Sequence, residues 1–301
     1  MQTLQFYFEH QPNSHRIAVL TLSIIIFWNT ENIIALNFDY RKWRHALTNS
    51  FFTLTDAPVQ FLLGIVLAYS TAWVTSHQWG LIYELPIKST FYQFIVAFIA
   101  LDFLEYVYHV LMHKVKRLWM CHLVHHSDRV VDTSTVLREH PFETAIRLTF
   151  LVLWVFVTGA GFWMVLARQF IQVISNVFAH ANFRLPEKID RMIGTVLITP
   201  NLHHVHHHYQ QPYTDSNYGD VLSIWDHIFG TFRRLEASKV VFGVDTCMDT
   251  RENAVFKQLL IIPFSGYRSP LEQTQTPAAV GQEQYEGLYQ EEPPTPTAIT
   301  A

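Results

Sequence analysis

Long apolar blocks separated by polar segments dominate this chain, and they predict membrane-spanning helices. The first block covers residues 17–37 and is long enough to cross a hydrocarbon core of about 30 Å. A second block extends from about Pro58 to Val74, and a third extends from Phe91 to about His113. Glu31 in the first block is costly in lipid, so we expect it to face other helices. The pattern predicts an all-α protein embedded in a membrane.

A further apolar region, at about residues 145–180, is interrupted by the sequence Gly-Ala-Gly at 159–161. We interpret it as a helical hairpin with arms near Ala145–Thr158 and Phe162–His180. A single crossing would place the two histidine-rich parts of the chain on opposite sides of the membrane, whereas a hairpin returns the chain to the same side. The expected fold is an integral-membrane helical bundle of about four transmembrane or re-entrant helices with a cytosolic helical cap.

Basic residues predict the orientation of this bundle. Arg41, Lys42 and Arg44 follow the first apolar block, and Lys114 and Lys116 follow the third. The positive-inside rule therefore places both positions, and the histidines near them, on the cytoplasmic face of a bacterial inner membrane or an endoplasmic reticulum membrane.

Composition supports this organisation. Half of the residues are hydrophobic and only 15% are charged, well below the roughly 25% of a soluble domain. The net charge of -4, without a basic stripe, argues against a nucleic-acid partner. We expect a short N-terminal segment at 1–15, a membrane domain at 16–265 and a disordered tail at 266–301 that is rich in Pro, Gln, Glu and Thr.

The third apolar block carries a polar stripe. Asp102, Glu105, His109 and His113 recur at intervals of three or four residues, so they share one face of a helix. Ionisable residues inside a membrane segment are costly and normally mark a functional site.

Histidines dominate the candidate chemistry. The 17 histidines include pairs and triplets spaced three or four residues apart, which places them on common helical faces. Clustered imidazoles repel one another when protonated, so a bound cation that selects their neutral form explains the clustering. The predicted metal ligands are His109, His113, His122, His125, His126, His140, His180, His203, His206 and His207.

The identity of the metal is less determined than its presence, because imidazole suits zinc, copper, iron and nickel. A single zinc takes three or four ligands, so this many histidines indicates two ions. Two irons can activate dioxygen, which would allow attack on the unactivated C–H bonds of lipids. The alternatives are a zinc-dependent membrane lipid hydrolase and a metal-binding or metal-transport membrane protein.

Three histidine sets carry a resemblance to a known family. His109-x3-His113, His122-x2-His125-His126 and His203-x2-His206-His207 resemble the histidine boxes of the fatty acid hydroxylase/sterol desaturase superfamily. The likeness extends over roughly residues 20–235 and includes Thr199-Pro200 before the last box and Asn217-Tyr218-Gly219 after it.

The resemblance implies a function as well as a fold. The box histidines would bind a non-haem di-iron centre and so carry the catalysis, with O2 as co-substrate. The substrate would be a membrane lipid, such as a sterol or a fatty acyl lipid, which is hydroxylated or desaturated. Electrons would come from an external donor similar to cytochrome b5, ferredoxin or rubredoxin.

The resemblance also guides the weaker assignments. His204-x2-His207-His208 fits the same spacing, but Thr199-Pro200 favours a box that begins at His203. His140 and His180 resemble additional ligand positions of the family. We expect His45, far from the boxes, to be an ordinary residue. Carboxylates that could accept the second N–H of a ligand histidine are Asp102, Asp128, Glu139, Glu143 and Asp226.

Overall fold

The computed structural model describes residues 6–7, 13–34 and 40–270, without the side chains of residues 13–20 and 250. Every named element in these residues is helical. The elements are α2 (Asn13–Ile34), α3 (Lys42–Ser76), α4 (Leu81–Glu84), α5 (Thr90–Lys114), α6 (Lys116–His126), η1 (Thr133–Leu137), α7 (Pro141–Thr158), α8 (Phe162–His180), α9 (Glu187–Ile193), α10 (Pro200–His206), α11 (Ile224–Phe229), η2 (Ala237–Lys239), α12 (Thr250–Asn253), α13 (Phe256–Leu259) and η3 (Ile262–Phe264).

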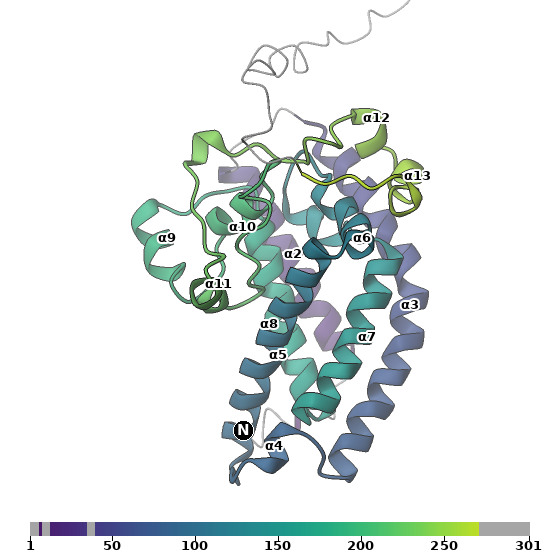
Figure 1. Ribbon diagram of the computed structural model, residues 1–301, viewed down its shortest axis with the longest axis vertical. Coiled ribbons are helices and arrows are strands. Elements are labelled where there is room, and N and C mark those ends of the chain that lie inside the picture. Colours follow the sequence, from purple (N-terminus) through teal and green to yellow (C-terminus); the bar gives the residue numbers. More distant parts are fainter. Residues whose placement is uncertain (1–5, 8–12, 35–39, 271–301) are drawn as a thin grey trace, which may run out of the picture.

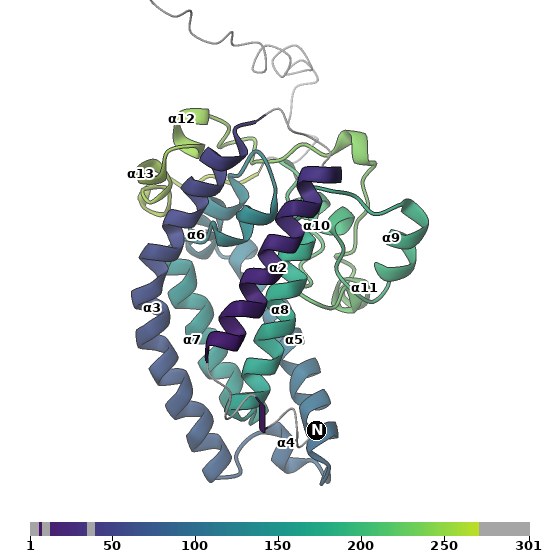
Figure 2. The same cartoon turned by 180° about the vertical axis from the view of Figure 1, so that it is seen from behind.

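Four helices in the described part of the chain are long and apolar enough to cross a membrane, which confirms the predicted integral-membrane bundle. They are α3 together with α4, α5, α7 and α8, and they run side by side in Figure 1. Their common core contains Leu67, Leu101, Val155 and Met164. The helix α2 lies along the bundle, where Figure 2 shows it beside α8, and Phe27 contacts Phe178 with ring centroids 5.8 Å apart.

The predicted hairpin consists of α7 and α8. Gly159 ends α7 with a φ of 77°, in the left-handed region that favours glycine. A Cβ atom on Gly80 would lie 2.3 Å from the backbone nitrogen of Gly159, so the turn after α3 and the turn after α7 pack backbone against backbone. This close packing joins the two turns at the end of the bundle that lies opposite the cap.

The second span begins earlier than the hydrophobic pattern predicted. We expected it to start near Pro58, but α3 begins at Lys42 and continues through this proline. Proline removes one helical hydrogen bond, yet a helix that packs along a neighbour over most of its length tolerates that loss. The N-terminal part of α3 extends into the cap, where Phe52 is fully buried.

The cap covers one end of the bundle (Figure 1) and contains α6, η1 and α9 to η3. Its core includes Phe52, Trp119, Leu123, Val124 and Val244. Residues 35–37 of the predicted first span and residues 271–301 of the predicted tail lie outside the described residues.

Candidate metal centre

Nine of the ten predicted ligands converge in the described residues and form two groups. Within each group, one ring nitrogen from every histidine lies within 4.8 Å of the others. Ligands on opposite sides of an ion with metal–nitrogen bonds of about 2.1 Å lie about 4.2 Å apart, so each group fits one ion with small adjustments. The five-histidine group contains His109, His113, His122, His126 and His206, and the four-histidine group contains His125, His180, His203 and His207.

The division between the groups explains the spacing His-x2-His-His. In the second box, the histidines at the first and last positions, His122 and His126, join the five-histidine group, whereas His125 joins the other. Residues i and i+4 share a helix face, and residue i+3 lies to one side of it. The second box therefore contributes to both groups, whereas both histidines of the first box, His109 and His113, join the five-histidine group.

The third box makes the opposite division. His203 and His207 join the four-histidine group, whereas His206 joins the five-histidine group. The rings of His126 and His207 consequently stack with centroids 4.6 Å apart across the boundary. The two groups are thus neighbours, held together by α6 and by the segment that contains α10.

Hydrogen bonds on the outer ring nitrogens orient several ligands. The Nδ1 atoms of His109, His180 and His206 lie 2.8, 2.8 and 2.7 Å from the backbone carbonyl oxygens of Tyr218, Asn176 and Ser216. A carbonyl oxygen only accepts, so each of these Nδ1 atoms carries the proton and the Nε2 lone pair is free for a metal. Such outer contacts fix the tautomer of a metal-binding histidine.

A carboxylate orients the ligand His122. Oε1 of Glu143 lies 2.6 Å from Nδ1 of His122, as the sequence led us to expect for a carboxylate near the boxes. Asp215, which the sequence did not single out, lies 3.3 Å from Nδ1 of His113. The backbone carbonyl partners were also missed, because no side-chain pattern marks them.

Two other predicted carboxylates act on the backbone instead. Asp226 accepts hydrogen bonds from the backbone N–H groups of Tyr218 and Gly219, both at 2.8 Å. Asp102 accepts hydrogen bonds from the backbone N–H groups of Val221 and Leu222, both at 3.3 Å, and from the side-chain Nε1 of Trp225 at 2.8 Å. Both carboxylates therefore order the loop whose Tyr218 carbonyl contacts His109.

Several buried ring nitrogens of the grouped histidines lack a hydrogen-bond partner among the described residues. They include both ring nitrogens of His126 and the Nε2 atoms of His113 and His206. Leaving a buried polar atom unsatisfied costs about 1–3 kcal/mol, so these atoms are poised for a ligand. Burial also lowers the pKa of His122 to about 3 and that of His206 well below its usual value, which keeps both rings in the neutral form that binds metals.

A polar cavity adjoins both groups. It has a volume of about 70 Å³, and His109 and His203 form part of its wall. Arg147 lies in the same wall and forms ion pairs with Glu105 at 3.3 Å and with Glu143 at 3.4 Å. The cavity is therefore bordered by metal-binding imidazoles on one side and by charged groups of the bundle on the other.

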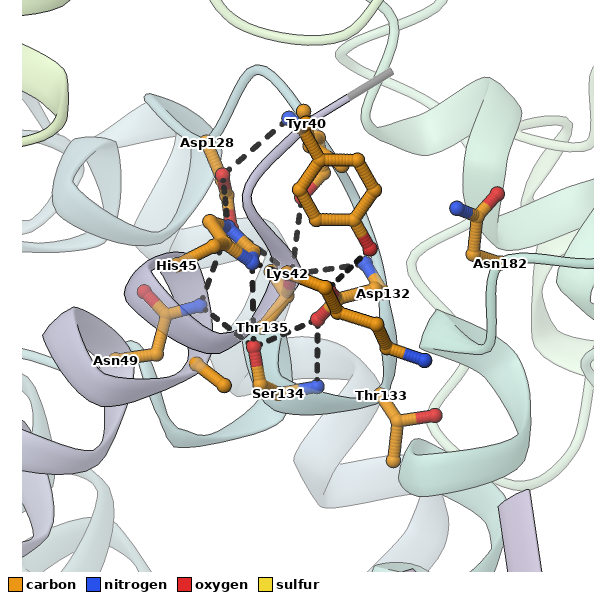
Figure 3. Close-up of polar contacts among 12 residues, drawn as sticks. Tyr40, Lys42, His45, Asn49, Asp128, Asp132, Thr133, Ser134, Thr135 and Asn182 are labelled. Atoms are coloured by element: carbon orange, nitrogen blue, oxygen red, sulfur yellow. Dashed lines mark hydrogen bonds and ion pairs between the residues drawn. The ribbon is translucent and has the colours of Figure 1, made fainter. Parts of the chain in front are cut away.

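A second buried network corrects our reading of His45. We expected an ordinary residue, but Nε2 of His45 lies 2.8 Å from Asp128 and Nδ1 lies 3.0 Å from Asp132, as Figure 3 shows. The hydroxyl of Tyr40 donates to Asp132 at 2.6 Å. Burial alone would raise the pKa of Asp128, but the charge of His45 holds it at about 2. The network ties α3 to the loop directly after His126.

A comparison with known protein families matches residues 94–231 to the fatty acid hydroxylase family. All nine grouped histidines lie within this range. Residues 94–231 belong to the fatty acid hydroxylase family. The match supports the resemblance that the histidine boxes indicated.

Individual relatives include lipid-modifying enzymes. The chain is 29% identical to human alkylglycerol monooxygenase over 241 residues, which cover 78% of this chain and 50% of that protein. The corresponding protein of Danio rerio is 27% identical over 255 residues, covering 81% and 51%. Ornithine lipid hydroxylase OlsE of Rhizobium tropici is 26% identical over 144 residues, covering 47% and 42%. The chain spans about half the length of the alkylglycerol monooxygenases, and no solved structure matches it significantly.

Within this fatty acid hydroxylase segment, the remaining histidines lie outside both groups. Nδ1 of His140, predicted as an additional ligand, accepts a hydrogen bond from the N–H of Phe142 and caps α7. His204 packs against Phe242, with ring centroids 5.2 Å apart, and Nδ1 of His208 accepts from the N–H of residue 241. The structure thus brings together the register that begins at His203 and leaves His140 out of the ligand set.

Proposed function

We propose that this protein is an O2-dependent hydroxylase or desaturase of a membrane lipid, such as a sterol or a fatty acyl lipid, and that its two histidine groups hold a pair of non-haem irons. The observation that carries this proposal is the arrangement of nine imidazoles in two adjacent groups at one end of a membrane bundle. Relatives named alkylglycerol monooxygenase and ornithine lipid hydroxylase support a lipid substrate.

A pair of irons would supply the activation of O2 that amino-acid side chains cannot provide. The chain itself orients the histidine side chains that would bind these irons. The Nδ1 protons of His109, His180 and His206 are held by carbonyl oxygens, which directs their Nε2 atoms inward. Glu143 accepts the Nδ1 proton of His122 and thereby makes that ring a stronger donor.

The overall reaction needs partners beyond the chain. Hydroxylation inserts one oxygen atom of O2 into a C–H bond and reduces the other to water, which consumes two electrons and two protons. Desaturation removes two hydrogens and reduces both oxygen atoms to water with the same supply. We propose that an external cytochrome b5-, ferredoxin- or rubredoxin-like protein delivers the electrons at the cytoplasmic face, where the positive-inside rule places the histidines.

The polar cavity favours a lipid substrate whose reacting carbon lies near a polar headgroup. Glu105, which is buried, and Arg147, which is half-buried, line the cavity next to the histidines. A wholly apolar substrate would leave these charges without solvation, which is unfavourable. We propose that the reacting carbon lies close to a headgroup that carries hydroxyl or amine groups, and that this headgroup enters the cavity.

The test combines metal analysis, oxygen consumption and lipid profiling. We expect the purified protein to contain iron, and cells that express it to accumulate lipids heavier by one oxygen atom or lighter by two hydrogens. His206→Ala removes a ligand of the five-histidine group and should abolish this product. His227→Ala is the control, because His227 is exposed and stacks only on Phe232 in the described structure.

Each alternative gives a different result. A zinc-dependent hydrolase would contain zinc and cleave lipids without consuming O2. A metal transporter would need ligands along a path near the bilayer midplane, whereas these ligands gather at one end of the helices. If the His206→Ala variant kept full iron content and activity, the assignment of the ligands would be wrong.

A further inference from the structure

Two short helices of the cap expose large apolar side chains. Met192 of α9 is 70% exposed, and Ile228 and Phe229 of α11 are 62% and 53% exposed. Ile189 precedes Met192 by three residues, so both lie on one face of α9. No residue in the described part of the chain covers these side chains, although they belong to a segment whose sequence looks soluble.

The position of α11 along the bundle indicates what surrounds it. The ring of Phe229 lies 5.8 Å from that of Phe103 and 5.4 Å from that of Tyr106, measured between centroids. Phe103 lies 13 residues after Thr90, the first residue of α5, which places it about 20 Å along this helix. The hydrocarbon core is about 30 Å thick. If the core begins where the four long helices end together, α11 lies within it.

Figure 1 shows this arrangement, with α11 beside the upper part of the bundle and α9 on the same side at the level of the cap. An open groove of about 360 Å³ lies between α4, α5 and α11. Its wall is apolar and includes Leu81, Ile99, Phe103, Ile228 and Phe229. The groove follows the outer surface of a predicted membrane span, so it continues the lipid-facing surface of the bundle.

Charge on the same lobe fits the boundary of a leaflet. Lys188 and Arg191 are exposed on α9 beside the apolar face that contains Met192, and Arg191 forms an ion pair with the exposed Glu187. A helix that exposes an apolar face flanked by basic residues suits the interface between acyl chains and phosphate headgroups. Because Arg191 is paired with Glu187, Lys188 supplies the basic charge, which contributes about 1 kcal/mol near an anionic membrane surface.

We propose that α9 and α11 form a lobe that lies in the lipid leaflet nearest the histidine groups, with an acyl chain of a membrane lipid in the groove against α5. The depth of α11 favours lipid over a soluble partner, and the groove is continuous with the span surface. The lobe is joined to the site, since the chain between α10 and α11 contains Ser216 and Tyr218, whose carbonyls contact His206 and His109. The proposal does not depend on the oxygenase chemistry.

Fluorescence quenching in lipid nanodiscs tests this proposal on the full-length protein. The variants Met192→Cys and Ile228→Cys each place one exposed thiol on the lobe, and the native Cys121 and Cys247 are buried. An attached bimane label should be quenched several-fold more strongly by lipids with brominated acyl chains than by aqueous iodide. Lys239→Cys is the matched control, because the Lys239 side chain is 67% exposed in another part of the cap and should show the reverse preference.

Two results would overturn the proposal. Equal iodide quenching at positions 192, 228 and 239, with no effect of brominated lipid, would place the lobe in water. Labels at 192 and 228 that are shielded from both quenchers would show that protein covers the lobe. In that case, energy transfer between differently labelled copies in one nanodisc would identify a second copy of this chain as the cover.

Discussion

The carboxylate of Glu31 accepts a hydrogen bond from the backbone N–H of Asn182 at 2.8 Å, which joins two residues 151 positions apart. The same Oε1 atom accepts the backbone N–H of Thr133 at 2.6 Å, and Lys42 forms an ion pair with Oε2 at 2.8 Å. Glu31 is fully buried and faces the bundle and cap, as its position in an apolar block predicted. It therefore links α2 to the start of η1, to the segment after α8 and to the start of α3.

Replacing Glu31 with glutamine should destabilise the protein. The variant leaves Lys42, which is only 12% exposed, without its carboxylate partner. Removing one member of a buried ion pair typically costs about 3 kcal/mol. We expect a clearly lower melting temperature in detergent. Glu236→Gln is the control, since the exposed pair with Lys239 contributes about 0–1 kcal/mol; equal effects of both variants would contradict this role for Glu31.

The contact between Glu143 and His122 leads to a second prediction. Glu143→Gln exchanges a carboxylate for a weaker acceptor, so metal affinity or activity should fall by about 10- to 100-fold. Metal titration of the purified variant measures this loss. Glu139→Gln is a matched control, because Glu139 also pairs with Arg147 and contacts no ligand histidine in the described structure. A larger loss in the control would show that the charge around Arg147 matters more than the histidine contact.

The division of the second box between the two groups predicts unequal effects of neighbouring substitutions. His126→Ala leaves four histidines in its group, whereas His125→Ala leaves only three. We expect the second variant to retain about one metal ion per chain and the first to retain nearly two, since four nitrogen ligands complete a tetrahedral site. Elemental analysis after dialysis checks this, and identical metal content in the two variants would argue against separate groups.

Protonation should destabilise the metal-free protein. Burial lowers the pKa values of His122 and His204 to about 3, whereas an unfolded histidine has a pKa of about 6.5. Between these values the unfolded chain binds more protons, so stability is complete above pH 6.5 and decreases as the pH falls below it. At pH 5 each group would cost about 2 kcal/mol. The melting temperature of chelator-treated protein should decrease from pH 7.5 to pH 5, and a constant value would contradict neutral burial.

Much of the architecture follows from local sequence. A helix that crosses a membrane forms its backbone hydrogen bonds internally and needs apolar side chains. The apolar blocks around Phe91 and Phe162 can therefore be recognised from the sequence without any tertiary information. The histidine boxes are equally local, because spacings of three and four residues fix which rings share a helix face. These two signals were sufficient to predict a bundle with a histidine-rich end and eight of the nine grouped histidines, and the family resemblance added His180.

Tertiary structure decided the contacts that depend on distant segments. The carbonyl of Tyr218 orients His109 only because the loop after α10 folds back onto α5. His45 contacts Asp128 only because α3 begins at Lys42, well before the predicted start of this span. The sequence has no apolar block at residues 224–229, whereas the contact between Phe229 of α11 and Phe103 sets this helix beside a membrane span. Helical periodicity is a property of neighbouring residues, but the contacts of a loop are determined by the packing of the whole chain.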